Sequence, residues 1–322
     1  AVAEAVRVGL RTEQISNTLL KLDPDNIVTV NNLGVAHQTL GDSLWAAGKL
    51  GAAISYYLRS LDDYGRATVG GAGFVIVRAY SVASTAYRQA QIGDANGAAA
   101  TIASGAPYLE KLRQNESQAK VAQAIVESLG KMAAAAAAFE RDDYAATGSF
   151  ATAAAGQLRA ITPRGNLEVS QRSISLFFAQ HLAGRAAFQS GDYAAAERAE
   201  REALAARKIW GTQAIPDQRD LGEVSTWLAL ALVRQGKSAE AAQLIGPVVK
   251  FQRELAARNH GDQWLPIELA SALYAQGLVD APSRAALLRE AATLLDAAPA
   301  ALRNVHDVRH WRERIAAAQG AG

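Results

Sequence analysis

The sequence of 322 residues contains no cysteine. It can therefore form no disulfide and has no thiolate to serve as a metal ligand or a nucleophile. An excess of charge of one sign is also missing, because 33 Lys and Arg are balanced by 31 Asp and Glu. The basic residues are scattered along the chain, which is unlike the concentrated basic surface of nucleic-acid-binding proteins. We therefore expect no nucleic-acid partner.

Long apolar runs are missing as well. A membrane-spanning helix needs about 20 apolar residues, and the alanine-rich run at residues 133–138 is far too short and too weakly hydrophobic. We expect no direct membrane insertion in this segment. Methionine occurs once, at Met132, so the sequence does not begin at a translation start. We interpret it as a fragment, and the composition leaves open whether it is cytoplasmic or periplasmic.

Proline is scarce, with 8 residues, whereas half of the sequence is apolar and much of that is alanine. Together with apolar residues spaced three and four apart, this composition predicts helix nearly throughout. The best strand candidate, Phe74–Val77, continues at helical spacing through Val82 and Ala86. We predict an all-α fold, and the richness in Ala and Arg indicates a bacterial origin.

One pattern recurs along the chain. Gly48–Leu61, with Leu40-Gly41 upstream, places small and large side chains where two packed antiparallel helices need them. Related segments begin at Gly191 and Gly236. A helical hairpin repeated along a chain is typical of a solenoid. Solenoids present extended binding surfaces, so the repeat favours a binding function over catalysis. We expect Ala53, Ala196 and Ala241, five positions after their turn residues, to occupy close helix–helix contacts.

The motif resembles the tetratricopeptide repeat (TPR), a helix-turn-helix unit of about 34 residues. Leu22–Asn26 resembles a TPR junction, and Leu33-Gly34 follows at the spacing of a first helix. Leu40-Gly41 repeats the motif one heptad later, and only this second register leads into the turn at Gly48. We therefore expect a first helix lengthened by two turns.

The resemblance implies a right-handed TPR-like α–α superhelix over residues 1–322. The expected turn residues lie 41 to 49 positions apart, a period similar to the longer repeats of kinesin light chains and some bacterial signalling proteins. They are Gly48, Gly93, Asp142, Gly191, Gly236 and Gly277. Residues 1–22 resemble the second helix of a truncated leading repeat, residues 27–298 six helical hairpins, and residues 299–322 a capping helix.

The predicted helices follow from these turns. First members of the six hairpins are expected near 27–46, 74–91, 117–140, 167–189, 217–235 and 264–276. Second members are expected near 49–64, 95–114, 143–160, 192–209, 238–259 and 282–297. A leading helix at 2–22 and a final helix at 300–318 complete the array. The final helix is predicted to cap the sixth hairpin by burying Trp311 against its second helix, around Leu294.

The resemblance also implies that first helices line a concave binding face. Carrying the TPR positions onto this sequence predicts a partner-binding stripe that is aromatic and nearly uncharged. Its members are Asn31, Gln38, Trp45, Tyr80, Tyr87, Met132, Phe139, Phe178, His181, Arg185, Phe188, Trp264 and Tyr274. We expect Tyr87, Phe139, Phe188 and Trp264 to share one groove. The alternative is that longer helices tighten the superhelix, so that these aromatic side chains pack against one another.

The stripe favours an apolar or mixed peptide as its ligand. TPR domains that bind acidic C-termini use a clamp of Lys, Arg and Asn, and only Asn31 and Arg185 resemble parts of it here. A carboxylate needs several converging donors to offset its desolvation. We therefore expect no acidic C-terminal ligand.

Two further groups of residues have chemistry to consider. His306 and His310 stand four apart, a spacing that can place two imidazoles on one metal. Asp307 could be a third ligand only with poor geometry, so we expect both histidines to be solvated and expect no metal or cofactor. The pairs Asp62-Asp63 and Asp142-Asp143 are predicted to lie at helix ends, the second pair as a cap.

Three functions remain open at this stage. The first is a non-enzymatic module that binds a protein or peptide on its concave face. The second is the sensor or effector part of a larger bacterial signalling or transcription-regulatory protein. The third, an enzyme with an α/α toroid, is disfavoured because the sequence contains no phosphate-binding loop, nucleophile elbow or metalloprotease motif.

Overall fold

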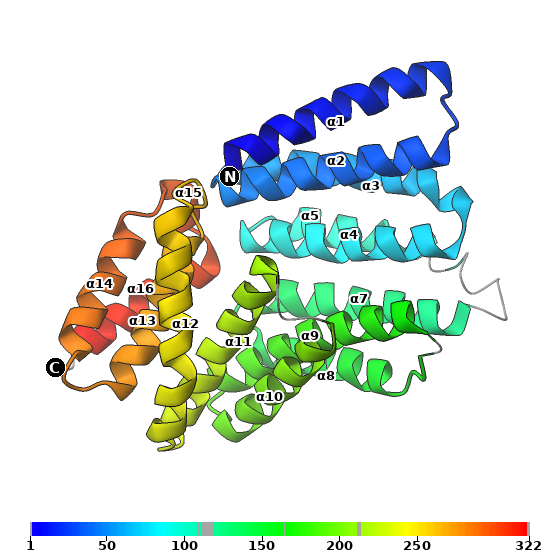
Figure 1. Ribbon diagram of the computed structural model, residues 1–322. Helices are drawn as coiled ribbons and strands as arrows, with labels where there is room; N and C mark the ends of the chain where they lie inside the picture. The colour runs from blue at the N-terminus through cyan, green and yellow to red at the C-terminus, as the bar shows by residue number, and fades with distance from the viewer. Residues whose placement is uncertain (1, 108–109, 111–118, 164, 211–213, 321–322) are drawn as a thin grey trace.

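The computed structural model describes residues 2–107, 110, 119–163, 165–210 and 214–320, and these residues form helices and no strand (Figure 1). The first half contains α1 (Val2–Leu22), α2 (Ile27–Ala46), α3 (Leu50–Ala67), the 3-10 turn η1 (Thr68–Gly70), α4 (Ala72–Gln91), α5 (Ala95–Ala103), α7 (Ala119–Phe139) and α8 (Tyr144–Arg159). The second half contains α9 (Asn166–Gln189), α10 (Tyr193–Trp210), α11 (Ile215–Arg234), α12 (Ser238–Arg258), α13 (Leu265–Val279), α14 (Arg284–Asp296), α15 (Ala300–Arg303) and α16 (His306–Gly320). None of these helices combines the length and the apolarity that a bilayer crossing requires.

The predicted helices are present with bounds within three residues of those expected, apart from two. The helix expected at 95–114 is interrupted, because α5 stops at Ala103 and a turn follows at Ser104-Gly105, after which Ala106, Pro107 and Glu110 are again helical. Residues 108–109 and 111–114 of that prediction lie outside the described residues. The single final helix is interrupted at Asn304-Val305, which separates α15 from α16.

Five of the six predicted turn residues have a left-handed backbone. Their φ angles are +73° at Gly48, +84° at Gly93, +60° at Asp142, +82° at Gly191 and +77° at Gly236. Glycine adopts this conformation without a steric penalty. Asp142 is the exception, because it has a side chain and still has a positive φ. The prediction for Gly277 is wrong, since it lies inside α13, where it packs against Leu288 of α14.

A small side chain follows each left-handed turn by five positions. Ala53, Ala98, Thr147, Ala196 and Ala241 are all fully buried. The prediction for Ala53, Ala196 and Ala241 is confirmed, and the structure extends the rule to the two alanine-rich hairpins. The five hairpins therefore share one packing geometry at the start of their second helices.

Both Leu-Gly motifs of α2 serve the same hairpin. A Cβ atom on Gly41 would lie 2.6 Å from the ring of Tyr57, and one on Gly34 would lie 2.8 Å from the ring of Tyr64. The two tyrosines are one heptad apart on α3, so each lies flat against a glycine of the antiparallel α2. Their hydroxyls donate to Asp42 Oδ1 at 2.7 Å and to Gln38 Oε1 at 3.1 Å.

The order of packing follows the order of the chain, because most helices contact their sequence neighbours. First members of successive hairpins also touch, as in α4 with α7, α7 with α9, and α11 with α13. In Figure 1, α2, α3 and α4 run across the view and α12 runs up it, so the helix direction changes along the array.

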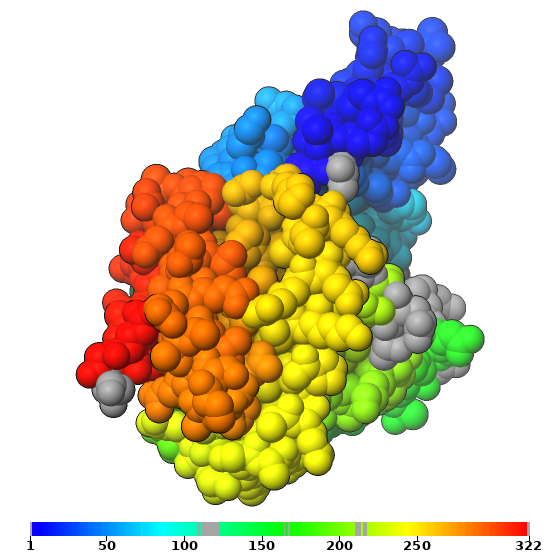
Figure 2. All heavy atoms as spheres, turned by 60° about the vertical axis from the view of Figure 1, so that its left-hand side comes forward, coloured from blue at the N-terminus to red at the C-terminus, as the bar shows by residue number. Residues whose placement is uncertain are grey.

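The first hairpin also contacts the sixth. The backbone N–H of Gln263 donates to Ala46 O at 2.7 Å, and Trp264 Nε1 donates to Trp45 O at 3.0 Å. The rings of Trp45 and Trp264 stack with centroids 5.6 Å apart and an interplanar angle of 6°. Figure 2 shows the N-terminal helices, in blue, seated against the yellow and orange segment that contains this loop. The chain thus returns on itself.

The last helix is anchored as predicted, but by different partners. Trp311 is buried, and α16 packs on α14. Its aromatic neighbours, however, lie on first helices: Trp227 of α11 at 5.2 Å and Tyr274 of α13 at 6.0 Å between ring centroids. Asp307 and Arg314 of α16 reach Arg185 and Gln189 of α9.

The glycine–tyrosine contact predicts opposite effects for two glycine substitutions in one hairpin. Gly41→Ala should destabilise the protein by about 1–3 kcal/mol, because the new methyl group overlaps the Tyr57 ring. Gly51→Ala should stabilise it by about 0.5–1 kcal/mol, since Gly51 is exposed in α3 with no atom near its Cβ position. Urea denaturation measures both changes. Equal effects of the two substitutions would contradict this packing.

Candidate ligand cavity

A cavity of about 510 Å³ lies where the two ends of the array meet. Its walls come from α2, α4, α9, α11, α13 and α16, and from the loop before α13. It is lined by Asp42, Trp45, Ala46, Tyr87, Arg88, Gln91, Phe178, Arg219, Asp220, Glu223, Thr226, Trp227, Asp262, Trp264, Ile267, Glu268, Ser271, Asp307 and Trp311. The volume is within the range of about 300–1,000 Å³ that is typical of sites for small ligands.

The structure brings four predicted stripe residues together in this cavity: Trp45, Tyr87, Phe178 and Trp264. Phe178 is the most accessible aromatic residue among them, with 42% of its surface exposed. The guanidinium of Arg88 lies 4.4 Å from the centre of the Trp45 ring, so one face of the aromatic wall carries a cation.

The other stripe residues do not line the cavity. Met132 and Phe139 are buried in the interior, so their side chains are not available for direct contact with a partner. Phe188 sets its ring edge against Trp227, so the expected shared groove includes Tyr87 and Trp264 and omits Phe139 and Phe188. Six more stripe residues also lie outside the lining. They are Asn31, Gln38, Tyr80, His181, Arg185 and Tyr274. The last five of these contact other side chains or backbone atoms. Much of the stripe therefore packs on itself, as the alternative interpretation held.

The stripe prediction missed α11 altogether. This helix contributes Arg219, Glu223 and Trp227 to the cavity, together with Asp220 and Thr226. The first three are spaced four residues apart and so lie on one helix face. This spacing was visible in the sequence. Because the helix at 217–235 was predicted to be the first member of the fifth hairpin, the spacing could have placed these three residues on the binding face.

The cavity lining is charged, unlike the predicted stripe, which is nearly uncharged. Six carboxylates and two guanidinium groups are among the residues that line the cavity. Arg219 bonds to Asp262 Oδ2 at 2.9 Å and to Glu268 Oε2 at 3.1 Å. Burial opposes the charge of Arg219, but these two carboxylates outweigh it and raise the pKa of the guanidinium. The cation is therefore already occupied by two acids.

Arg185 organises the wall behind Glu223 and Asp307. Its guanidinium is 2% exposed, lies 4.2 Å from the centre of the Phe139 ring, and forms ion pairs with Asp307 and, at 3.8 Å, with Glu223. Burial disfavours a charged Asp307, yet Arg185 overcomes this and holds the pKa of that carboxyl well below its usual range. Asp307 thus presents a fixed negative charge to the cavity.

His181 links two carboxylates in the same wall. Its Nδ1 lies 2.9 Å from Glu200 Oε2 and its Nε2 lies 3.2 Å from Glu223 Oε1. Burial alone would lower the pKa of His181, but Glu200 and Glu223 reverse the effect and raise it to about 10. The imidazole is therefore doubly protonated at neutral pH and donates to both acids.

The same arrangement occurs in the first hairpin. His37 of α2 lies 2.7 Å from Asp63 of α3 and 3.3 Å from Glu13 of α1. The expectation that Asp63 lies at a helix end is wrong, because it is buried within α3 and paired with this histidine. Asp143, in contrast, is confirmed as the cap of α8 and accepts from the N–H of Ala146 at 3.0 Å.

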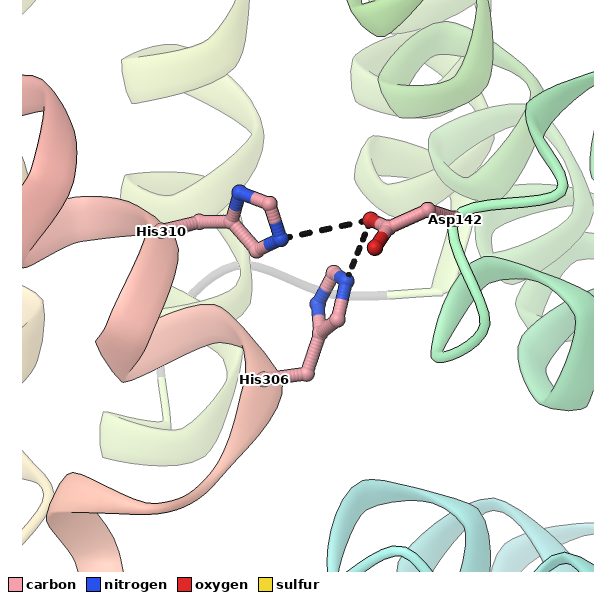
Figure 3. A group of neighbouring side chains, drawn as sticks. All are labelled: Asp142, His306 and His310. Atoms are coloured by element: carbon pink, nitrogen blue, oxygen red, sulfur yellow. Dashed lines mark hydrogen bonds and ion pairs between the residues drawn. The ribbon is translucent and has the colours of Figure 1, made fainter.

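His306 and His310 also differ from expectation. His306 is 3% exposed and sets its ring against Phe139, at 5.4 Å between centroids. Both imidazoles point at Asp142, from the turn between α7 and α8, as Figure 3 shows. The prediction that both are solvated is wrong for His306, whereas His310 stays partly exposed. The sequence could not indicate that α16 packs against a turn 164 residues away.

No family model matches this sequence, and no curated protein matches it. The resemblance to TPR proteins therefore rests on the residues and hairpins described above.

The pKa of His181 predicts how stability depends on pH. In the unfolded chain the histidine has a pKa of about 6.5. In the folded chain its pKa is about 10, so the folded state binds the imidazole proton more tightly than the unfolded state does. The stabilisation is fully present below pH 6.5 and is lost as the pH rises toward 10. We expect His181→Gln to destabilise by about 3 kcal/mol at pH 6, because Glu200 loses its buried partner. The deficit should shrink steadily as the pH rises.

Urea denaturation of the wild type and of the variant at a series of pH values measures this difference. His260→Ala is the matched control, since His260 is exposed in the loop before α13 and should change the free energy of unfolding little. A deficit for His181→Gln that stays constant across the range would contradict the protonated state of His181.

Proposed function

We propose that this chain is a non-enzymatic interaction module that binds a peptide segment of a partner protein in the central cavity. The observation that carries the proposal is the cavity itself, in which Trp45, Phe178 and Trp264 converge from three separate parts of the chain. Large aromatic side chains in a recess are the usual anchors of protein recognition.

The architecture that we propose is a TPR-like, right-handed superhelix. Three features of the described hairpins support it: the left-handed turns, the buried small residue five positions later, and the contacts between successive first helices. In such an array the first helices form the inner face. The cavity is lined mainly by first helices, which agrees with this architecture.

The charges of the cavity favour a particular kind of peptide. Carboxylates outnumber guanidinium groups in the lining, and Arg219 is already held by two acids. Few donors are thus left to offset the desolvation of an acidic C-terminus. Glu223 has half of its side chain exposed beside the aromatic residues. We propose a ligand segment with apolar or aromatic residues and a basic side chain, which Glu223 and the aromatic faces would accommodate.

A second candidate function has its own observation. The cavity is bounded by both the first hairpin and α13, which meet at the Trp45–Trp264 stack. A ligand bound there would contact both ends of the array and so favour one arrangement of them. We therefore also propose, as an alternative, a sensor or effector role within a larger bacterial signalling or transcription-regulatory protein.

The peptide proposal predicts selective loss of binding when the accessible anchor is removed. Random peptides displayed on phage are selected on the immobilised protein, and the affinities of the enriched peptides are then measured by calorimetry. We expect Lys- or Arg-containing apolar peptides, and we expect Phe178→Ala to weaken their binding at least about tenfold. Because 42% of Phe178 is exposed, replacing it with alanine should leave the fold intact.

Phe150→Ala is the matched control. Phe150 is likewise 42% exposed, but it lies on α8 beside a separate hollow formed with α4, α5 and α7. Its removal should leave peptide affinity unchanged. Enrichment of no peptide, or equal losses for the two variants, would contradict a binding site in the central cavity.

A further inference from the structure

Three potential metal ligands converge outside the cavity, at the contact between α16 and the turn that joins α7 to α8. Asp142 Oδ1 lies 2.8 Å from His306 Nε2 and 3.2 Å from His310 Nε2. Figure 3 shows both rings directed at this carboxylate from one side of α16. Each residue offers a ligand atom, and the three atoms lie within 4.8 Å of one another. A single ion can contact three atoms so spaced, because Zn–N and Zn–O bonds are about 2.0–2.2 Å long.

The second nitrogen of each imidazole faces another carboxylate. His306 Nδ1 lies 3.8 Å from Glu140 Oε2 and 3.7 Å from Asp307 Oδ1. His310 Nδ1 lies 3.5 Å from Glu313 Oε2. Histidines that bind metal through one nitrogen usually direct the other N–H to a carboxylate, carbonyl or water, which fixes the ring and raises its basicity. Both imidazoles here face carboxylates on that side, at 3.5–3.8 Å, which is longer than a normal hydrogen bond.

Glu140 gives an independent indication. Its side chain is 4% exposed, and neither of its carboxylate oxygens has a hydrogen-bond partner among the residues that the structure describes. His306 Nδ1 is also buried without one. A buried carboxylate is unfavourable unless it is compensated, and a cation held by His306 would supply a positive charge close to Glu140.

The backbone of Asp142 points to the same conclusion. It occupies the left-handed turn position that is glycine in four other hairpins, and among the described residues it is the only non-glycine with positive φ. Aspartate tolerates this conformation better than most residues, but still less well than glycine. Retaining a carboxylate here places it opposite two histidines, whereas a glycine would serve the turn alone.

We propose that Asp142, His306 and His310 bind a divalent transition-metal ion. Two imidazole nitrogens and one carboxylate oxygen form a donor set that suits zinc, with water completing a four-coordinate site. Binding requires a free lone pair on each Nε2, so a proton that either atom donates to Asp142 is released to solvent when the ion binds. Asp142 and His310 are partly exposed, which leaves a route for the ion. Tyr144, whose hydroxyl also donates to Asp142 Oδ1, lies beside the site.

The ion would join segments that are remote in the sequence. Asp142 belongs to the third predicted hairpin, and both histidines belong to α16, which also supplies Asp307 and Trp311 to the cavity wall. A metal at this contact therefore fastens one wall of the cavity to the middle of the array. Because only the folded chain assembles the three ligands, binding stabilises the fold.

The test is a zinc titration of the full chain after dialysis against a chelator. Calorimetry in competition with a chromogenic chelator gives stoichiometry and affinity, and thermal melting gives the stabilisation. We expect one zinc per chain and a higher Tm with zinc. Asp142→Gly and His310→Ala should each weaken binding at least about 100-fold and abolish the zinc-dependent rise in Tm.

Asp142→Gly separates ligand loss from misfolding. Glycine is the residue of the equivalent turns, so the metal-free variant should keep the turn and fold, and its own Tm without zinc is the reference for any zinc-dependent rise. His260→Ala, which removes an exposed histidine outside the cluster, should bind zinc like the wild type. Glu140→Gln should weaken binding about 10- to 100-fold if Glu140 supports His306.

Cobalt(II) provides a second readout. Visible absorption typical of four-coordinate cobalt should appear with the wild type and be absent with Asp142→Gly and His310→Ala. Zinc affinities that are equal in the wild type, Asp142→Gly and His310→Ala would overturn the proposal. So would a wild type that takes no zinc from the competing chelator and shows no zinc-dependent change in Tm.

Discussion

The stacked indoles of Trp45 and Trp264 hold the first hairpin against the segment that begins the sixth. Repeats in a helical array normally contact only their neighbours, so nothing in the hairpins themselves brings the first against the sixth. Here two stacked indoles and two hydrogen bonds, from Gln263 N–H and Trp264 Nε1, join segments more than 200 residues apart. The central cavity exists because this contact sets α2 opposite α13.

Buried charge sets the arrangement of the remaining walls. Arg185 and His181 of α9 and Glu200 of α10 are buried, Asp307 of α16 is mostly buried, and each is paired with an opposite charge. A buried ion pair adds little net stability, but a buried charge that loses its partner is strongly unfavourable. Any shift of α9 against α10 or α16 would separate such pairs. The network therefore holds these helices in one register and keeps the cavity lining charged but compensated.

The last helix links the two proposals. One part of α16 reaches the cavity through Asp307 and Trp311, and another presents His306 and His310 to the turn at Asp142. The proposed peptide site and the proposed metal site are therefore neighbours on a single helix of fifteen residues. An ion at the turn would limit the movement of α16, and with it the movement of one cavity wall.

The sequence by itself determined what depends on local periodicity. The spacing of apolar residues located the helices within a few residues, and Gly48, Gly191 and Gly236 marked turns whose left-handed backbone favours glycine. Ala53, Ala196 and Ala241 were identifiable because helices in a hairpin approach closely at a fixed distance from the turn. The spacing of Arg219 and Glu223 also placed them on one face of α11, but the predicted stripe did not include that face.

Tertiary structure alone decided which remote residues meet. Phe139 and Phe188 were predicted to share a groove with Tyr87 and Trp264, yet they are packed away from the cavity. Phe139 contacts His306 of α16, and Phe188 contacts Trp227 of α11. Asp142 and His306 could not be paired from the sequence, since their 2.8 Å contact follows from the docking of α16 across the array. Local propensity places residues on a helix face, but only the packing of the helices against one another decides what that face touches.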